Sequence, residues 1–233
     1  MMNGYSVDQI RHAEEPHRAA GEPLMLRAAA GLAAEIRTLM GAAAEGELRA
    51  VVLLVGSGDN GGDALYAGAE LAAEGTMVAI VPTGSRMHEK ALEAARDAGA
   101  RIHWSDPLDA VLLTRLALSS DVIVDGILGT GTSSNPTLRG RAREVVDIIR
   151  PAVLGAAAPA VVAVDIPSGI NPDTGAVPDS GILRADLTVT FGGCKAGLLL
   201  EPATKFAGRV HLVDIGIGDD LALLTPVIDG TNS

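Results

Sequence analysis

The chain has 233 residues, 48% of them hydrophobic and only 2% aromatic, so it can bury a sizeable core made of Ala, Val, Leu and Ile. Its formal net charge of -11 would repel phosphate backbones and anionic lipid, so we expect neither nucleic acid nor a membrane surface as a partner. Cys194 is the single cysteine, which excludes an intrachain disulfide and a cysteine metal cluster.

The start of the chain shows no targeting signal. Residues 1–16 contain neither a basic stretch nor an apolar stretch of the kind that secretory signals carry. The apolar runs elsewhere are short and broken, so no transmembrane helix is expected, and we expect a cytoplasmic protein. Two helices are predicted next, near 6–19 and 23–44, and their Ala and Leu content fits packing either on a sheet or on a second subunit.

After residue 48, short β-branched runs alternate with Ala- and Leu-rich stretches. This alternation is typical of βαβ units with a mostly parallel sheet, and strands that are apolar throughout are buried on both faces. The predicted strands are 50–55, 77–81, 101–104, 121–125, 161–165, 186–191 and 209–213. The sequence therefore predicts the α/β class.

The segments between these strands read as crossover helices. They are 62–74, 86–98, 108–118 and 138–150. Nothing marks a boundary, so we expect a single domain over residues 1–233. The final segment, 219–233, is polar with Gly and Asp, and we expect it to be a loose tail.

The first strand runs into a glycine-rich loop. Gly56, Gly58 and Gly61 have the G-x-G-x-x-G spacing between a strand and a helix, where free backbone N–H groups can bind an anion. An ordinary NAD site also needs a carboxylate at the end of the second strand. Residues 81–83 are Val, Pro and Thr, so a conventional NAD(P)-dependent oxidoreductase is disfavoured.

The same loop carries three polar side chains, Asp59, Asn60 and Asp63. Their oxygens could coordinate a hard cation or hold a polar ligand. The alternative is that the two aspartates simply cap the following helix.

Three further strands end in chemically unusual sequences. Asp125 closes one strand, Asp165 closes another and is followed by Ser168, and Lys195 follows a third. Ligands of an open α/β sheet lie beyond the carboxyl ends of its strands, so these groups are expected to converge on one edge. A buried carboxylate costs several kcal/mol unless it is paired or binds a cation.

Structural alternatives exist for two of these groups. Asp125 could cap the loop at 129–131, because Asp often bonds nearby backbone. Lys195 could be an ordinary solvated surface lysine.

Four segments, in this order and spacing, carry a resemblance: GSGDNGGDAL, VDGILGTG, VDIPSGINPDTG and TVTFGGCKAGLL. By them the chain resembles the YjeF N-terminal domain family, the NAD(P)H-hydrate epimerases, from about residue 6 to residue 217. The resemblance implies a three-layer α/β/α Rossmann-like fold, a homodimer and a bound potassium ion. It also implies interconversion of the R and S epimers of NADHX and NADPHX, which are hydrated, redox-inactive cofactors. A separate ATP- or ADP-dependent dehydratase then restores the S epimer.

The resemblance also implies a set of site residues. The cation ligands are expected to be Asn60, Asp125 and Ser168. Asp165 is expected to act as acid and base, with Lys195 beside it. The expected contacts of the hydrated cofactor are Asp59, Asn60, Gly61, Gly62, Asp63, Gly129, Thr130, Gly131, Thr132, Ser133, Ser134, Asn135 and Asp165.

The chain departs from the family pattern at three positions. Asp59 stands where Asn is usual, Ala64 where Gly is usual, and Leu26 where Glu is frequent. The departures at Asp59 and Leu26 motivate the alternative of a non-catalytic nucleotide- or partner-binding module on the same fold. A weaker alternative is a structural partner for a separate dehydratase. The chain also ends where bifunctional relatives continue into a dehydratase domain, so an epimerase alone is expected.

Overall fold

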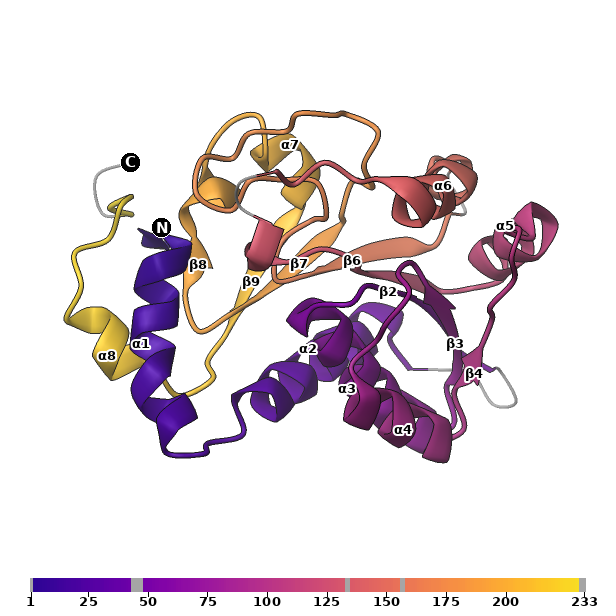
Figure 1. Cartoon of the computed structure of the whole chain (residues 1–233), viewed down its shortest axis with the longest axis horizontal. Coiled ribbons are helices and arrows are strands. Elements are labelled where there is room, and N and C mark those ends of the chain that lie inside the picture. Colours follow the sequence, from indigo (N-terminus) through magenta and orange to yellow (C-terminus); the bar gives the residue numbers. More distant parts are fainter. Residues whose placement is uncertain (1, 43–47, 133–134, 156–157, 231–233) are drawn as a thin grey trace.

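The computed structural model describes residues 2–42, 48–132, 135–155 and 158–230 (Figure 1). Seven strands form one sheet in the order β4-β3-β2-β5-β6-β7-β9, and every neighbouring pair is parallel. Their bounds are β2 (Ala50–Val55), β3 (Met77–Pro82), β4 (Arg101–Ile102), β5 (Val122–Gly126), β6 (Ala160–Val164), β7 (Leu187–Phe191) and β9 (Arg209–Val213). All seven predicted strands are confirmed within a residue or two.

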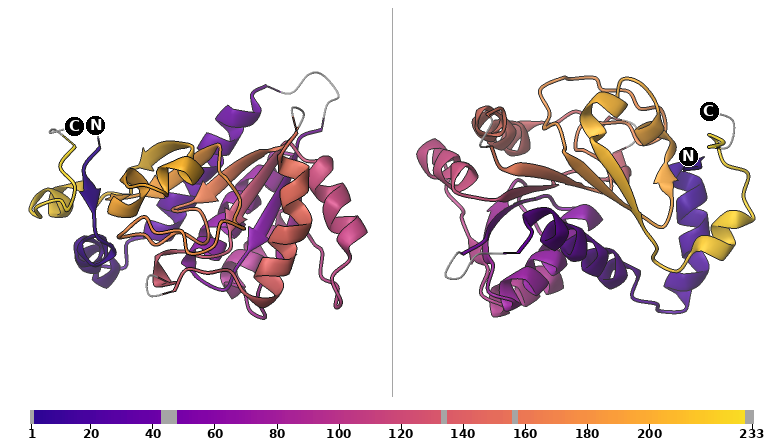
Figure 2. Two further views of the ribbon diagram at one scale, coloured as in Figure 1. Left: turned by 90° about the horizontal axis from the view of Figure 1, so that it is seen from above. Right: turned by 180° about the vertical axis from the view of Figure 1, so that it is seen from behind.

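Helices cover both faces of the sheet (Figure 1 and Figure 2). One face carries α2 (Leu24–Met40), α3 (Asp59–Ala73) and α4 (Glu89–Asp97), and the other carries α5 (Ala110–Leu118), α6 (Gly140–Ile149) and α7 (Thr204–Ala207). Short 3-10 turns complete the connections: η1 (Thr130–Thr132), η2 (Arg150–Val153) and η3 (Ala196–Leu199). The fold is therefore the three-layer α/β/α sandwich expected from the sequence.

The central strand β2 shows why both faces are apolar. Val51, Leu53 and Val55 point into the core under α2 and α3, whereas Val52 and Leu54 point into the core under α5 and α6. Side chains of a strand alternate between faces, so a strand buried on both sides needs an uninterrupted apolar run. All five side chains are at most 2% exposed.

The topology creates a switch point beside β2. From β2 the chain moves outward through β3 to β4, then returns to form β5 on the other side of β2. The connections after β2 and β5 therefore lead to helices on opposite faces, and such a switch point is where open α/β sheets bind ligands. The glycine-rich loop and the start of α3 lie at this point.

The N-terminal segment differs from the sequence prediction. Gly4–Tyr5 form β1, which pairs in parallel with β8 (Cys194–Lys195) in a small second sheet, and neither strand was predicted. Helix α1 (Val7–Ala19) then begins at Ser6, whose side chain and that of Gln9 form a capping box. Whereas α2 packs on the sheet, α1 contacts α8 (Gly218–Ala222).

The prediction of a loose C-terminal tail is wrong for residues 219–230. Helix α8 packs on α1, and Ile228 exchanges two backbone hydrogen bonds with Gly4, at 2.8 and 3.0 Å. Leu221 of this segment is buried in the core and Leu224 packs against it, so apolar side chains as well as backbone hydrogen bonds hold the segment in place. Residues 231–233 lie outside the described residues. No helix in the described part of the chain is both long enough and apolar enough to cross a bilayer.

His17 ties α1 to α8. Its Nδ1 lies 2.9 Å from Glu22 Oε1, and its Nε2 lies 2.9 Å from Asp220 Oδ2. The hydrogen bond to Asp220, followed by the one to Glu22, raises the pKa of His17 above its usual 6.5. The hydrogen bond from His17, followed by the one from Arg27, lowers the pKa of Glu22.

We expect the contribution of His17 to stability to depend on pH. A raised histidine pKa stabilises the fold fully below the ordinary value, and this stabilisation is lost as pH rises through the raised value. Thermal unfolding of wild type and His17→Gln should therefore differ most in mildly acidic buffer and converge in alkaline buffer. A difference that stays constant over this range would contradict the assignment.

Candidate functional site

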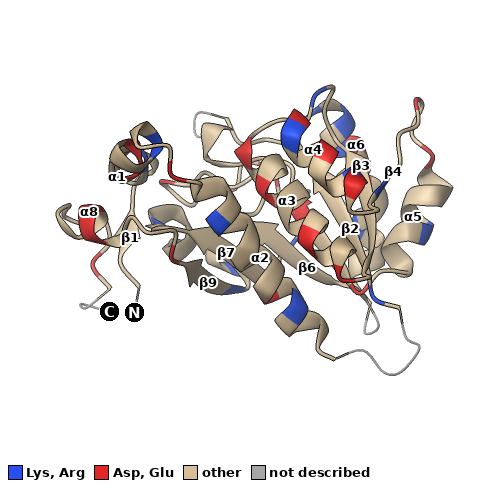
Figure 3. Ribbon diagram, turned by 90° about the horizontal axis from the view of Figure 1, so that it is seen from below, with Lys and Arg blue, Asp and Glu red and all other residues tan. Residues whose placement is uncertain are grey.

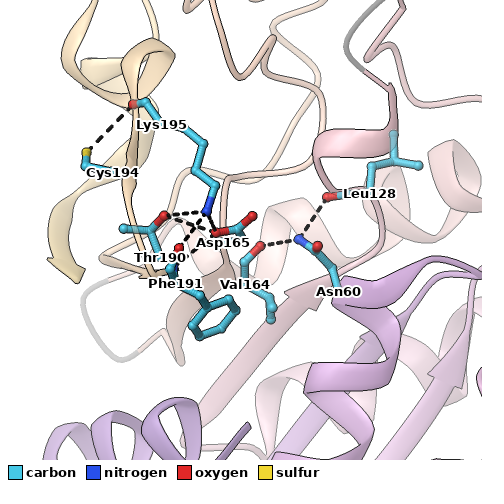
Figure 4. Close-up of polar contacts among 8 residues, drawn as sticks. All are labelled: Asn60, Leu128, Val164, Asp165, Thr190, Phe191, Cys194 and Lys195. Atoms are coloured by element: carbon cyan, nitrogen blue, oxygen red, sulfur yellow. Dashed lines mark hydrogen bonds and ion pairs between the residues drawn. The ribbon is translucent and has the colours of Figure 1, made fainter. Parts of the chain in front are cut away.

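Polar side chains from four strand ends meet at the carboxyl edge of the sheet (Figure 4). The predicted convergence is confirmed by contacts: Asp125 bonds Ser168, Asp165 bonds Lys195, and Asn60 reaches the backbone of the strand that leads to Asp165. All five side chains are buried. Segments up to 135 residues apart, from Asn60 to Lys195, thus build one site.

The centre of the site is a buried ion pair. Lys195 Nζ donates to Asp165 Oδ1, to Thr190 Oγ1 (3.2 Å) and to the Phe191 carbonyl oxygen (3.1 Å). Asp165 Oδ1 also accepts from Thr190 Oγ1 (3.0 Å) and from the Phe191 N–H (3.2 Å). Lys195 is 3% exposed, so the alternative of a solvated surface lysine is wrong.

These donors all use one oxygen of Asp165. Among the described residues, no hydrogen-bond donor reaches its other oxygen, Oδ2. The carboxylate is thus held firmly through Oδ1 while Oδ2 stays available. A group fixed on one side and open on the other is suited to exchange a proton with a bound molecule.

The backbone at Asp165 is unusual. Its φ of 65° is the only positive value for a non-glycine residue in the described segments. The Ile166 N–H donates to the Val164 carbonyl across it (2.7 Å), which makes Asp165 the centre of a rare γ-turn. Such a conformation costs about 1–3 kcal/mol and is concentrated at functional sites.

Asp125 and Ser168 form a second buried pair. Asp125 Oδ1 accepts from Ser168 Oγ (2.6 Å) and from the Ile127 N–H (3.3 Å), and Oδ2 accepts from the Ser168 N–H (2.8 Å). Asp125 thus bonds backbone at 127 and 168, not the loop at 129–131. Burial raises the pKa of Asp125, and the bonds from Ser168 and Ile127 offset part of that rise.

Asn60 lies beside this pair. Its Nδ2 donates to the carbonyl oxygens of Val164 and Leu128, the latter at 3.4 Å. A Cβ atom at Gly129 would collide with the Asn60 amide, and one at Gly56 would collide with the Ile127 carbonyl. Glycine at these two positions therefore lets the loops after β2 and β5 touch.

Three side chains of the site bear oxygen atoms of the kinds that bind hard cations. Asn60, Asp125 and Ser168 offer an amide, a carboxylate and a hydroxyl, which are the oxygen donors that hard cations prefer. No basic side chain bonds Asp125 in the described part of the chain. Within that part there is also no group of three or more His, Cys, Asp or Glu side chains placed to hold a metal. A single carboxylate among neutral oxygens suits a low charge on the ion.

Helix α3 begins directly after the glycine-rich loop that follows β2. Its N-cap is Gly58, with no side-chain capping bond, so the alternative that Asp59 and Asp63 cap the helix is wrong. The N–H groups of Gly61 and Gly62 donate to Gly58 O, at 3.1 and 3.3 Å, and are therefore used within the helix. The earlier N–H groups and the positive end of the helix dipole remain for an anion.

Asp59 and Asp63 lie on one face of α3, four residues apart. Asp59 is exposed, whereas Asp63 is 6% exposed and makes no hydrogen bond to the described residues. Burial, followed by the charges of Asp165 and Asp59, raises the pKa of Asp63 well above its usual range. Its own surroundings therefore favour the protonated acid.

The loop predicted to contact a cofactor, 129–135, is only partly described. Gly129 touches Asn60, and Gly131 has open space where a side chain would be. Asn135 Oδ1 accepts from the N–H of Thr137, within its own loop. Ser133 and Ser134 lie outside the described residues.

Sequence reasoning missed Glu14 of α1. This half-buried carboxyl has a pKa raised by burial, with Lys195, Asp165 and Asp59 among the charges that act on it. Figure 3 shows acidic residues on α1, α3 and α8. Nothing in the sequence distinguishes Glu14 from other polar positions of its helix, because its place depends on the β1–β8 pairing that anchors α1.

Comparisons with known proteins point to one family. A family model described as YjeF-related protein N-terminus matches residues 21–197. The "NAD(P)H-hydrate epimerase" of Clavibacter michiganensis is 50% identical over 97% of this chain and 95% of its own length. That of Microbacterium testaceum is 44% identical over 96% of this chain and 82% of its own length.

Two further similarities extend this picture. The "Bifunctional NAD(P)H-hydrate repair enzyme Nnr" of Mycobacterium tuberculosis is 42% identical over 95% of this chain, which spans 43% of that protein. The crystal structure of yeast ynu0 superposes with a TM-score of 0.69 at 18% identity, covering 91% of this chain and 87% of the yeast chain. The yeast structure supports the fold alone.

We expect Ser168→Ala to lower the free energy of unfolding by about 1–3 kcal/mol, because it leaves the buried Asp125 carboxylate short of a donor. Urea denaturation measures the change. Ser119→Ala, at the exposed end of α5, is the matched control and should stay within about 0.5 kcal/mol of wild type. Equal effects of the two substitutions would contradict the role of Ser168.

Proposed function

This chain belongs to the family of YjeF-related protein N-termini, and we propose that it is an NAD(P)H-hydrate epimerase acting on NADHX and NADPHX. The names and the 50% identity of its relatives over most of the chain support this activity. The observation that carries the mechanism is the buried Asp165–Lys195 pair at the carboxyl edge of the sheet, beside the ends of β6 and β7, with no hydrogen bond from the described residues to the second carboxylate oxygen.

The reaction takes place at C6 of the hydrated nicotinamide ring, which bears a hydroxyl and adjoins the ring nitrogen N1. Inversion requires the hydroxyl to be lost and regained, through either an iminium-like cation or a ring-opened aldehyde. Both routes need a group that exchanges protons with the reacting oxygen. We assign this role to Asp165 through Oδ2, with Lys195 holding the carboxylate through Oδ1.

A carboxylate beside the ring also favours positive charge. The ring carries a developing cation when the hydroxyl leaves, and a preorganised anion lowers the energy of such a state. Thr190 and the Phe191 N–H fix the orientation of Asp165 before substrate arrives. This side of the site therefore needs little reorganisation during the reaction.

The first turn of α3 is assigned to the phosphates of the cofactor. The net charge of the chain is -11, so an anionic ligand must be attracted locally, by N–H groups at the helix start. Asp59 lies at this helix start and is exposed, so water screens its charge. The loop at 129–135 is assigned to the remaining contacts of the cofactor.

A potassium ion is proposed on Asn60, Asp125 and Ser168. The ion would supply a positive charge beside the buried Asp125 and join the loops after β2, β5 and β6. The chemistry at C6 is assigned to the side chains of the chain alone.

The alternatives are less well supported. A non-catalytic module has no need of a buried ion pair on a strained backbone, and the absence of a carboxylate after β3 disfavours a hydride-transfer enzyme. A homodimer, a cytoplasmic location and cooperation with an ATP- or ADP-dependent dehydratase stay predictions. The bifunctional Mycobacterium proteins, which carry additional sequence, support the last of these.

We expect the purified chain to interconvert the R and S epimers of NADHX, and Asp165→Asn to slow this at least roughly 100-fold, the lower range for acid–base catalysis. Asn tolerates the positive φ, so the backbone should be retained. Chromatography of an initially pure R epimer measures the rate. Asp109→Asn, at the N-cap of α5 where Asn caps as well as Asp, is the control. A near-normal rate for Asp165→Asn would remove that residue from the role.

Potassium should stabilise the fold through Asp125. At roughly a hundred times its dissociation constant, a ligand that binds only the native state adds about 2.7 kcal/mol. Melting temperatures in potassium chloride and in choline chloride of equal ionic strength should differ for wild type but not for Asp125→Asn. Asp121→Asn, at the other end of the same strand, should keep the response. A response that Asp125→Asn shares with wild type would place the ion elsewhere.

A further inference from the structure

We propose that Asp63 is a second catalytic acid, which protonates the hydroxyl that leaves C6 while Asp165 stabilises the cation and accepts the proton of the returning water. The proposal rests on the epimerase function and deepens it. It assigns the two proton transfers of one inversion to carboxyl groups on two different elements, helix α3 and the loop after β6.

The first observation is the position of Asp63. It lies one turn inside α3, on the face that bears Asp59. Asn60, three residues earlier on the same helix, donates to the carbonyl oxygen of Val164, the residue before Asp165, so the start of α3 lies against the strand end that carries Asp165. A molecule that reaches Asp165 therefore also comes near Asp63.

The second observation is the lack of a partner. No donor from the described residues bonds the Asp63 carboxyl, although it is 6% exposed. A buried ionised carboxylate without a partner is costly, so such a group keeps its proton instead. Burial and the neighbouring carboxylates raise the pKa of Asp63, which agrees with this reading.

The two carboxyl groups are thus differentiated. The Lys195 ammonium, the Thr190 hydroxyl and the Phe191 N–H all donate to Asp165. Asp63 accepts no hydrogen bond from the described residues, although it is 6% exposed. Two neighbouring carboxyl groups whose surroundings differ in this way commonly divide into an acid and a base.

One inversion at C6 requires two proton transfers. Asp63 gives its proton to the C6 hydroxyl, the C–O bond breaks, and its electron pair leaves with the oxygen as water. The lone pair of N1 forms the C6=N1 bond, and the cation faces the Asp165 carboxylate. Water then adds to the opposite face of C6 and loses a proton to Asp165. Exchange with solvent restores both carboxyl groups, so only the configuration at C6 has changed.

Four charged groups face Asp63 from the elements around it. They are Asp59 on the same helix, Asp165 after β6, Lys195 on β8 and Glu14 on α1. Three are acidic and one is basic, so their combined effect favours the protonated form of Asp63. Because the reaction needs this form, kcat should fall with rising pH once Asp63 ionises.

Asp63→Asn tests the proposal. Asn has the same shape without the acidic proton, so we expect kcat to fall at least roughly 100-fold while KM changes little. The residual rate should also lose the alkaline decline that wild type shows. The matched control is Asp186→Asn at the amino end of the sheet. Among the described residues its carboxylate bonds the backbone N–H of Val161 alone (2.8 Å), and the variant should keep both kcat and the pH profile.

A measurement without substrate complements the kinetics. Infrared difference spectra of wild type minus Asp63→Asn at neutral pH should show the carbonyl band of a protonated carboxylic acid. A carboxylate band instead would overturn the proposal. It would also be overturned if Asp63→Asn changed only KM, or if this variant kept the kcat of wild type. If wild type itself fails to interconvert the epimers, the epimerase function is wrong and the role of Asp63 falls with it. If wild type is active and Asp63→Asn equals it, the role of Asp63 alone is wrong.

Discussion

The site depends on an imbalance of buried charge: three buried carboxyl groups, Asp63, Asp125 and Asp165, accompany one buried basic side chain, Lys195, in the described part of the chain. The Lys195 ammonium is the cation that contacts the buried Asp165, while Asp63 and Asp125 are buried without a basic partner among the described residues. Unpaired buried charge is costly, so each carboxyl must be satisfied in its own way. Asp165 has Lys195, Asp125 has three hydrogen bonds and the oxygen donors of a proposed cation site, and Asp63 can keep its proton. One constraint thus gives three similar side chains three different roles.

Backbone geometry makes this arrangement possible. The loops after β2 and β5 leave the sheet at its switch point and approach so closely that only glycine fits at 56 and 129. The γ-turn at Asp165 directs its carboxylate toward Lys195, although the positive φ is unfavourable for an aspartate. The positive φ is unfavourable in itself and the close approaches restrict the chain, so the burial of the apolar core on both faces of the sheet must offset their free-energy cost.

Much of this could be read from the sequence. Apolar runs gave the strands nearly to the residue, and the placement of Asp125, Asp165 and Lys195 after them predicted the convergence, because parallel strands end at a common edge. The β1–β8 pairing, the position of Glu14 and the docking of the C-terminal segment on α1 could not be predicted. Each depends on contacts between distant, locally unremarkable segments. The different surroundings of Asp63 and Asp165 were likewise invisible, because burial and hydrogen-bond partners depend on contacts between distant segments.

The most direct test is a crystal structure of the chain with hydrated NADH bound. The account predicts the C6 hydroxyl of the ring beside Asp165, with the phosphates over the first turn of α3. Cofactor bound at the amino ends of the strands, or bound with its hydrated ring far from Asp165 and Lys195, would contradict it.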